Sequence, residues 1–194
     1  MLGKQAKILS SVQQKLVLSY LDETRYPLRN RIAFLLSMKA GLRAKEIATL
    51  QWRHISDAEG NIAQTITIED KGSKGRGGRT IPMNKALHHE LLELQTHRSP
   101  SATDAVFYSE RKLGNVSAQT VVDFFADLYG KLEFEGASSH SGRRTFITNA
   151  AKKITTVGGS LRDVQFLAGH SSLQTTQRYI ESDTAAKRMV VDIV

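Results

Sequence analysis

One stretch of strand-like alternation constrains how this chain of 194 residues can fold. Residues 62–68, IAQTITI, alternate in the way expected of a strand with one buried face. Thr80–Pro82 is the predicted partner strand, so Glu69–Arg79 would form the loop of a hairpin. Most of the remaining chain has the apolar spacing of helices, and Val106–Tyr108 is predicted to be a short extended piece. The pattern therefore predicts a mainly helical α+β domain with one small antiparallel sheet.

Capping and turn residues mark where the predicted helices begin and end. Ser10 and Gln13 form a capping-box pattern at the start of the first helix. Pro27 fits the first turn of the second helix, which Gly41 ends. The other predicted helices span residues 43–50, 84–96, 117–132, 141–153, 160–168 and 172–180, and a last one begins at 184.

The charge of the chain narrows the kind of partner it can bind. It carries 27 Lys and Arg residues against 19 Asp and Glu residues, a formal net charge of +8, which favours a polyanion. A hydrophobic fraction of 40% is enough for a packed core. No apolar run is long enough to span a membrane, and we expect no membrane partner. The absence of cysteine excludes disulfides and cysteine-bound metals, and it fits a reducing cytoplasm.

The most informative stretch is LAGHSSLQTTQRYI, Leu167–Ile180, in which His170 precedes Tyr179 by nine residues. A tyrosine hydroxyl, with a pKa of about 10, is a weak nucleophile unless cations neutralise the group that it attacks. A phosphodiester is such a group, because its non-bridging oxygens require positive donors. The stretch therefore predicts a phosphate-directed nucleophile with basic partners elsewhere in the chain.

Three other segments supply candidates for those partners. His140 and Arg143 lie three residues apart at a predicted helix start, so both can face one ligand. Arg43 begins a helix in GLRAKEI, where its planar fork suits two phosphate oxygens and Glu46 can orient it. Lys74 lies in the glycine-rich loop DKGSKGRGGRT, as a lysine able to protonate a leaving oxygen.

Each segment taken alone also has a simpler interpretation. An HxxR pattern alone is more often a capping region with solvated arginines. Arg43 and Glu46 could form a surface ion pair or belong to a helix-turn-helix, although the following helix has few side chains suited to base edges. The loop with Lys74 could be a flexible charged turn.

The ordered set of candidates resembles the catalytic signature of the tyrosine recombinases, the phage integrase family: Arg43, Lys74, His140, Arg143, His170 and Tyr179. The resemblance extends from about Ser10 to Tyr179. It implies a mainly helical catalytic domain that cuts and rejoins DNA through a 3′-phosphotyrosine intermediate. It also implies that no ATP, metal or other cofactor is needed.

The resemblance implies a role for each candidate. Arg43, Arg143 and His170 would clamp the scissile phosphate. His140 would assist proton movement at the tyrosine, and Lys74 would be the general acid for the 5′ oxygen. Contacts to the DNA backbone are expected from four further basic residues: Lys71, Arg76, Arg79 and Arg144.

The chain departs from the common family pattern in two places. Ser141, Gly142 and Arg144 stand where the family usually has apolar residues and often a further histidine. Only about ten residues precede the first helix, so we expect residues 1–194 to form a single catalytic domain without an N-terminal core-binding domain.

The resemblance and the charge together define the expected partners. Double-stranded DNA is the main one, and an accessory DNA-binding protein would compensate for the absent core-binding domain. The apolar stripe of Thr184–Val194 would pack either on its own domain or on a neighbouring copy bound to DNA. The expected location is the cytoplasm, at the nucleoid.

The favoured function is that of a site-specific recombinase or integrase, and two alternatives stay open. A type IB topoisomerase-like enzyme would relax DNA by the same chemistry without pairing sites. A catalytically silent DNA-binding regulator would keep the fold alone, but the presence of all six signature residues argues against it.

Overall fold

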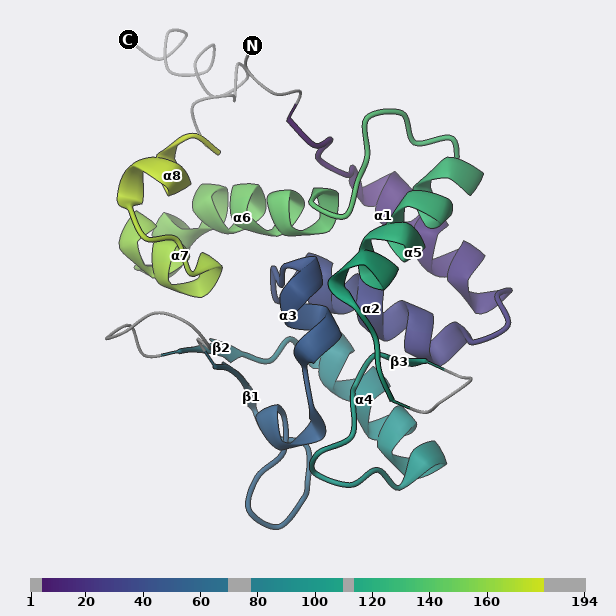
Figure 1. Cartoon of the computed structure of the whole chain (residues 1–194). Coiled ribbons are helices and arrows are strands. Elements are labelled where there is room, and N and C mark those ends of the chain that lie inside the picture. The colour runs from purple at the N-terminus through teal and green to yellow at the C-terminus, as the bar shows by residue number, and fades with distance from the viewer. Residues whose placement is uncertain (1–4, 70–77, 110–113, 180–194) are drawn as a thin grey trace, which may run out of the picture. The chain divides into compact units, whose positions relative to one another are not determined.

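The computed structural model describes residues 5–69, 78–109 and 114–179 (Figure 1). The chain divides into two compact units, Met1–Phe146 and Ile147–Val194. That it forms one catalytic domain stays a prediction. Four predicted features lie outside the described residues: Lys71, Lys74, Arg76 and the helix of Thr184–Val194.

The first unit is built around a buried helix, α2 (Pro27–Lys39). Every residue from Ile32 to Met38 is buried, with at most 4% of its surface exposed. Helices α1 (Ser11–Asp22) and α4 (Lys85–Arg98) pack against α2 (Figure 1). The short α3 (Ala44–Thr49) packs against α5 (Ala118–Lys131). The core of the unit is therefore formed by helices packed around α2.

The predicted helix starts of this unit are confirmed. Ser10 Oγ accepts the Gln13 N–H at 3.2 Å, and Gln13 Oε1 accepts the Ser10 N–H at 3.1 Å, which completes the capping box of α1. Pro27 occupies the first turn of α2. Asn84 and Ser117 cap α4 and α5 through their side-chain oxygens.

The predicted hairpin is present, although its first strand is shorter than expected. Strands β1 (Thr65–Ile68) and β2 (Arg79–Pro82) are antiparallel, with Ile66 opposite Ile81. Ile62 lies before β1 and pairs only with Ser56, in an isolated bridge. A second pair, β3 (Tyr108–Ser109) with β4 (Gly114–Asn115), was not predicted, because strands of two residues show no alternation. The predicted class, mainly helical α+β with small antiparallel pairing, is confirmed.

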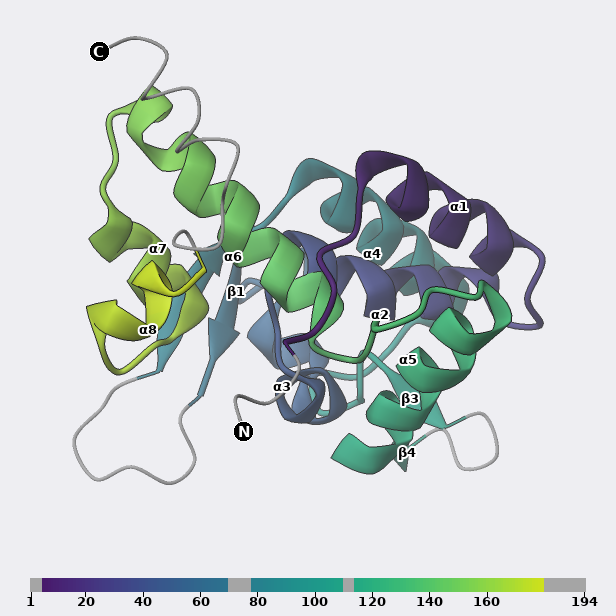
Figure 2. The same ribbon diagram turned by 90° about the horizontal axis from the view of Figure 1, so that it is seen from above.

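The second unit consists of short helices. Helix α6 (Ser141–Lys153) begins in the first unit and continues into the second, where the 3₁₀ helix η2 (Ile154–Val157) follows. Helices α7 (Leu161–Ala168) and α8 (Leu173–Gln177) pack side by side (Figure 2). In the part of the chain that is described, no helix is long and apolar enough to cross a membrane.

Two glycines allow the start of α6 to lie close to the end of α2. A Cβ atom at Gly142 would overlap Ser37 Oγ, and Ser37 is fully buried in α2. Gly41, just after α2, has φ +64°, and a Cβ there would overlap the ring of Phe146. The close approach fixes the backbone from which Arg143 extends.

The contact at Gly142 predicts an unusual stability effect. Gly142→Ala should destabilise the fold by about 1–3 kcal/mol, because the added methyl group overpacks a closed contact. The matched control is Gly130→Ala in the last turns of α5, where a Cβ would meet no atom within 4 Å. That change should stabilise by up to about 1 kcal/mol, through helix propensity. Urea unfolding of both variants measures the difference, and a stabilising Gly142→Ala would contradict the close packing.

Candidate active site

Arg43 is held at both its backbone and its side chain by Glu46. It precedes α3 with an extended backbone, φ −75° and ψ 156°. Its N–H donates to Glu46 Oε2 at 2.7 Å, and its Nη1 donates to Glu46 Oε1 at 3.0 Å. The Arg43 side chain is still 41% exposed, so solvent reaches a large part of it.

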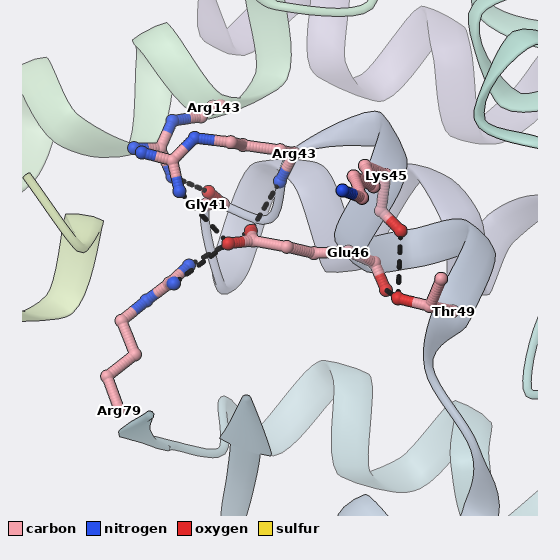
Figure 3. A network of polar contacts seen from close by, with 7 residues as sticks. All are labelled: Gly41, Arg43, Lys45, Glu46, Thr49, Arg79 and Arg143. Atoms are coloured by element: carbon pink, nitrogen blue, oxygen red, sulfur yellow. Dashed lines mark hydrogen bonds and ion pairs between the residues drawn. The ribbon is translucent and has the colours of Figure 1, made fainter. Parts of the chain in front are cut away.

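Arg79, the first residue of β2, binds the same carboxylate with both prongs of its fork. Its Nη1 donates to Glu46 Oε1 at 2.8 Å, and its Nη2 donates to Glu46 Oε2 at 3.0 Å (Figure 3). The Arg79 side chain is only 10% exposed. Its sequence context assigns Arg79 to the DNA backbone, whereas the structure places its guanidinium group on Glu46.

Burial and the neighbouring positive charges shift the pKa of Glu46 in opposite directions. Burial alone would raise the pKa of its carboxyl group, because a carboxylate loses hydration there. The hydrogen bonds from the Arg79 side chain and the Arg43 backbone outweigh this effect, and the charges of both arginines add to them. The pKa of Glu46 is therefore lower than its ordinary value, and the group is ionised at neutral pH.

Arg143 extends from the first turn of α6 and is tied to the turn that follows α2. Its Nη1 donates to the carbonyl oxygen of Gly41 at 2.6 Å, and only 4% of the residue is exposed. Figure 3 shows the side chains of Arg43 and Arg143 extending in the same direction. With Arg79, the cluster holds three guanidinium groups and the Glu46 carboxylate, which leaves an excess of positive charge.

The two neighbours of Arg143 in the predicted site differ in exposure. His140 is exposed immediately before α6, and its carbonyl oxygen accepts the Arg144 N–H at 2.8 Å. The half-buried Arg144 donates from Nη1 to the carbonyl oxygen of Ala6 at 2.9 Å. The DNA contact assigned to Arg144 stays a prediction.

In the second unit, the backbone of His170 is fixed by the end of α7. Gly169 ends that helix in the left-handed conformation, with φ +60°. The His170 N–H then donates to the carbonyl oxygen of Gln165 at 3.1 Å. In return, Gln165 Nε2 donates to the carbonyl oxygen of His170 at 3.1 Å.

The imidazole of His170 is fixed by Thr176, which is fully buried. Thr176 Oγ1 lies 2.9 Å from His170 Nδ1, and this is its only side-chain partner among the described residues. A hydroxyl that accepted a hydrogen from Nδ1 would need a further acceptor for its own hydrogen, because an unmade buried hydrogen bond costs about 1–3 kcal/mol. Donation from the hydroxyl to Nδ1 avoids that need, and with this direction neutral His170 carries its hydrogen on Nε2.

Tyr179 lies directly against this histidine. The two rings are stacked, with their centroids 5.5 Å apart and their planes 21° from parallel. The Tyr179 N–H donates to the carbonyl oxygen of Thr176 at 3.1 Å, so Thr176 contacts both residues. The spacing of nine residues between His170 and Tyr179 thus brings the two side chains together.

Sequence reasoning did not identify Thr176 and Gln165, which hold His170. Both lie within or beside the LAGHSSLQTTQRYI stretch, where threonine and glutamine resemble ordinary helix surface residues. The signal that the sequence offered was a threonine three positions before Tyr179, without any sign of its burial. Lys74 lies outside the described residues.

The described residues contain no group of three or more His, Cys, Asp or Glu side chains that could hold a metal ion.

Comparisons with known proteins match this chain to a family. Residues 7–186 match the model of the phage integrase family. The chain is 29% identical over 187 residues to tyrosine recombinase XerA of Pyrococcus horikoshii, covering 96% of this chain and 60% of that protein. It is 30% identical over 161 residues to tyrosine recombinase XerC of Pelobacter propionicus, covering 81% and 49%. The chain thus spans about half to three fifths of the length of these relatives.

Solved structures share the fold. A crystal structure of XerA recombinase matches with a TM-score of 0.69 and 21% identity, over 94% of this chain and 63% of that chain. The XerH site-specific recombinase bound to its palindromic difH substrate matches with a TM-score of 0.74 and 20% identity, over 97% and 53%. Because the family model covers nearly all of its residues and the fold agrees, the chain belongs to the phage integrase family, the tyrosine recombinases.

Proposed function

We propose that this chain carries the catalytic machinery of a site-specific DNA recombinase or integrase. The observation that carries the proposal is the stacking of Tyr179 on His170, whose Nδ1 is held by Thr176. A tyrosine beside a histidine that presents an Nε2 hydrogen is suited to attack a phosphate whose oxygens accept that hydrogen. The arginine cluster supports the same target, because its excess positive charge suits a phosphodiester.

In the proposed reaction, Arg43, Arg143 and His170 donate to the non-bridging oxygens of one phosphate. The Tyr179 hydroxyl oxygen bonds to phosphorus while the bond from phosphorus to the 5′ oxygen breaks. His140 accepts the tyrosine proton, and the lysine assigned as general acid, Lys74, protonates the departing 5′ oxygen.

The second half of the proposed reaction reverses the first. A 5′ hydroxyl attacks the phosphotyrosine and releases the tyrosine, so one phosphate ester replaces another of similar energy. No ATP is therefore required. The guanidinium groups provide the positive charge that a metal ion supplies in other phosphoryl-transfer sites, so we propose that no metal takes part.

The proposed partner is double-stranded DNA, to which the net charge of +8 is suited. Among similar structures, XerH is bound to a difH substrate and the Tn1549 transposon integrase to circular intermediate DNA. We also propose that copies of the chain associate on DNA through Thr184–Val194, that an accessory DNA-binding protein assists, and that the enzyme acts at the nucleoid. Residues 1–194 would serve as the catalytic domain.

The first test is covalent capture of DNA. Tyr179→Phe should abolish the adduct while leaving binding largely intact, because only the nucleophilic hydroxyl is removed. Duplexes of randomised sequence with nicks at varied positions trap the intermediate, because the short cleaved strand diffuses away. Adducts are then resolved on a denaturing gel.

An adduct formed by Tyr179→Phe would show that another residue is the nucleophile. A wild-type protein that binds DNA but never forms an adduct would instead indicate a silent DNA-binding protein. Relaxation of supercoiled plasmids without paired sites would favour topoisomerase-like chemistry.

The arginines provide the second test. Arg43→Ala and Arg143→Ala should each slow single-turnover cleavage by about 10²–10³-fold, the scale of removing one preorganised donor to a developing anion. Arg143→Lys should rescue poorly, because a point charge cannot replace a planar fork. The control is Arg53→Ala: the Arg53 side chain is 44% exposed, close to the 41% of Arg43, and also pairs with a glutamate. Normal cleavage by either alanine variant of Arg43 or Arg143 would remove that arginine from the site.

Thr176 provides the third test. Thr176→Val keeps the buried volume but removes the donor to His170 Nδ1, so the preferred ring tautomer should be lost and cleavage should slow by up to about tenfold. Thr176→Ser keeps the hydroxyl and should cleave within about twofold of wild type. The ¹⁵N chemical shifts of the His170 ring report the tautomer directly, and a hydrogen found on Nδ1 in the wild-type protein would contradict the assignment.

A further inference from the structure

The carboxylate of Glu46 accepts four hydrogen bonds from two arginines. Oε1 accepts Nη1 of Arg43 and Nη1 of Arg79, while Oε2 accepts the Arg43 N–H and Nη2 of Arg79. These bonds range from 2.7 to 3.0 Å, the usual range for charge-assisted bonds. The Glu46 side chain is 14% exposed, so water supplies little of its solvation.

The two arginines differ in how much of the side chain solvent can reach. Arg43 is 41% exposed, whereas Arg79 is 10% exposed and has both Nη atoms on Glu46. To contact a DNA phosphate, Arg79 would have to withdraw from a largely desolvated carboxylate, which is costly to leave unpaired. Arg79 is therefore poorly placed for the backbone contact that its sequence position suggests.

We propose that Arg79 is a positioning residue for Arg43. Arg79 donates a hydrogen bond to each oxygen of Glu46 and so fixes the carboxylate. The carboxylate in turn fixes the backbone N–H and the guanidinium group of Arg43. Arg79 thereby prepares the phosphate-binding geometry of Arg43 without touching the DNA. This role rests on the proposed function only in that Arg43 is taken to bind the phosphate.

Charge explains why a second arginine is needed. Burial by itself would favour the neutral form of Glu46, and a neutral carboxyl group cannot accept four hydrogen bonds. The charged groups that act on Glu46 are Arg79 from β2 and Arg43 at the start of α3. Arg79 thus keeps Glu46 ionised even when the charge of Arg43 is shared with a bound phosphate.

Arg79→Met separates positioning from DNA contact. The positioning role predicts that single-turnover cleavage falls by about 10- to 100-fold, the scale of losing charge-assisted hydrogen bonds. The dependence of DNA affinity on salt should match wild type. A lost phosphate contact would instead reduce the slope of log affinity against log salt by about 0.9, and that result would overturn the proposal. Arg53→Met, the control, should change neither quantity.

A double-mutant cycle tests whether Arg79 acts through Glu46. Glu46→Gln should slow cleavage, and adding Arg79→Met should then cost little more, because the shared carboxylate is already lost. Independent, additive losses would overturn the proposal. If Arg79→Met does not fold, Arg79→Lys replaces it. A lysine can still contact a DNA phosphate, so near-normal cleavage would indicate a DNA contact. A lysine cannot bind both oxygens of Glu46 as an arginine does, so the positioning role predicts slower cleavage.

A measurement without DNA separates this proposal from the proposed function. In ¹H–¹⁵N spectra, the Arg43 amide, which donates to Glu46 at 2.7 Å, should shift in Arg79→Lys and stay in place in Arg53→Met. An unshifted Arg43 amide in folded Arg79→Lys would overturn the positioning role. Failure of the wild-type protein to form a DNA adduct would count against the proposed function alone.

Discussion

The arginine cluster of the first unit depends on the Glu46 carboxylate, which neutralises part of its charge. Like charges drawn together repel, and the Glu46 carboxylate offsets that repulsion for Arg43 and Arg79. Arg143 is joined to the same region by a different contact, the carbonyl oxygen of Gly41 two residues before Arg43. A short turn after α2 therefore organises cations from α3, β2 and α6. Its geometry in turn needs glycine, because Gly41 has φ +64° and lies against Phe146.

In the second unit, hydrogen bonds and ring stacking hold His170 and Tyr179. His170 is bonded to Gln165 at its backbone, to Thr176 at Nδ1 and to the face of Tyr179. None of these contacts adds a formal charge beside the tyrosine. This difference between the two units fits the proposed roles. The arginines would bind an anion, whereas the tyrosine and histidine need a fixed orientation and a known position of the imidazole hydrogen. Each unit thus orders its polar groups by a different kind of contact.

Sequence patterns predicted the helix starts at Ser10 and Pro27 and the β1–β2 hairpin, because caps and alternation are local signals. The assignment of Tyr179 as nucleophile stays a prediction. They did not predict the position of Arg79. A basic residue after a basic loop suggests a contact to phosphate. Only the folded structure shows Arg79 bonded to Glu46, which lies 33 residues earlier in the chain. The donor role of Thr176 was likewise hidden, because it depends on burial that the sequence does not display. Contacts between distant segments and the exposure of single side chains are what sequence reasoning could not supply.

The continuity of α6 has a practical consequence for dividing the protein into fragments. Arg143 lies in its first turn, and the same helix passes from one compact unit into the other at Phe146. A cut at that boundary would break a helix in its middle. The natural place to divide the chain is the Gly158–Gly159 turn after η2, where Gly158 has φ +78° and the backbone leaves helical geometry. Two fragments divided there would keep the arginines and α6 on one piece and His170 with Tyr179 on the other, so fragment association would test whether the proposed reaction needs both.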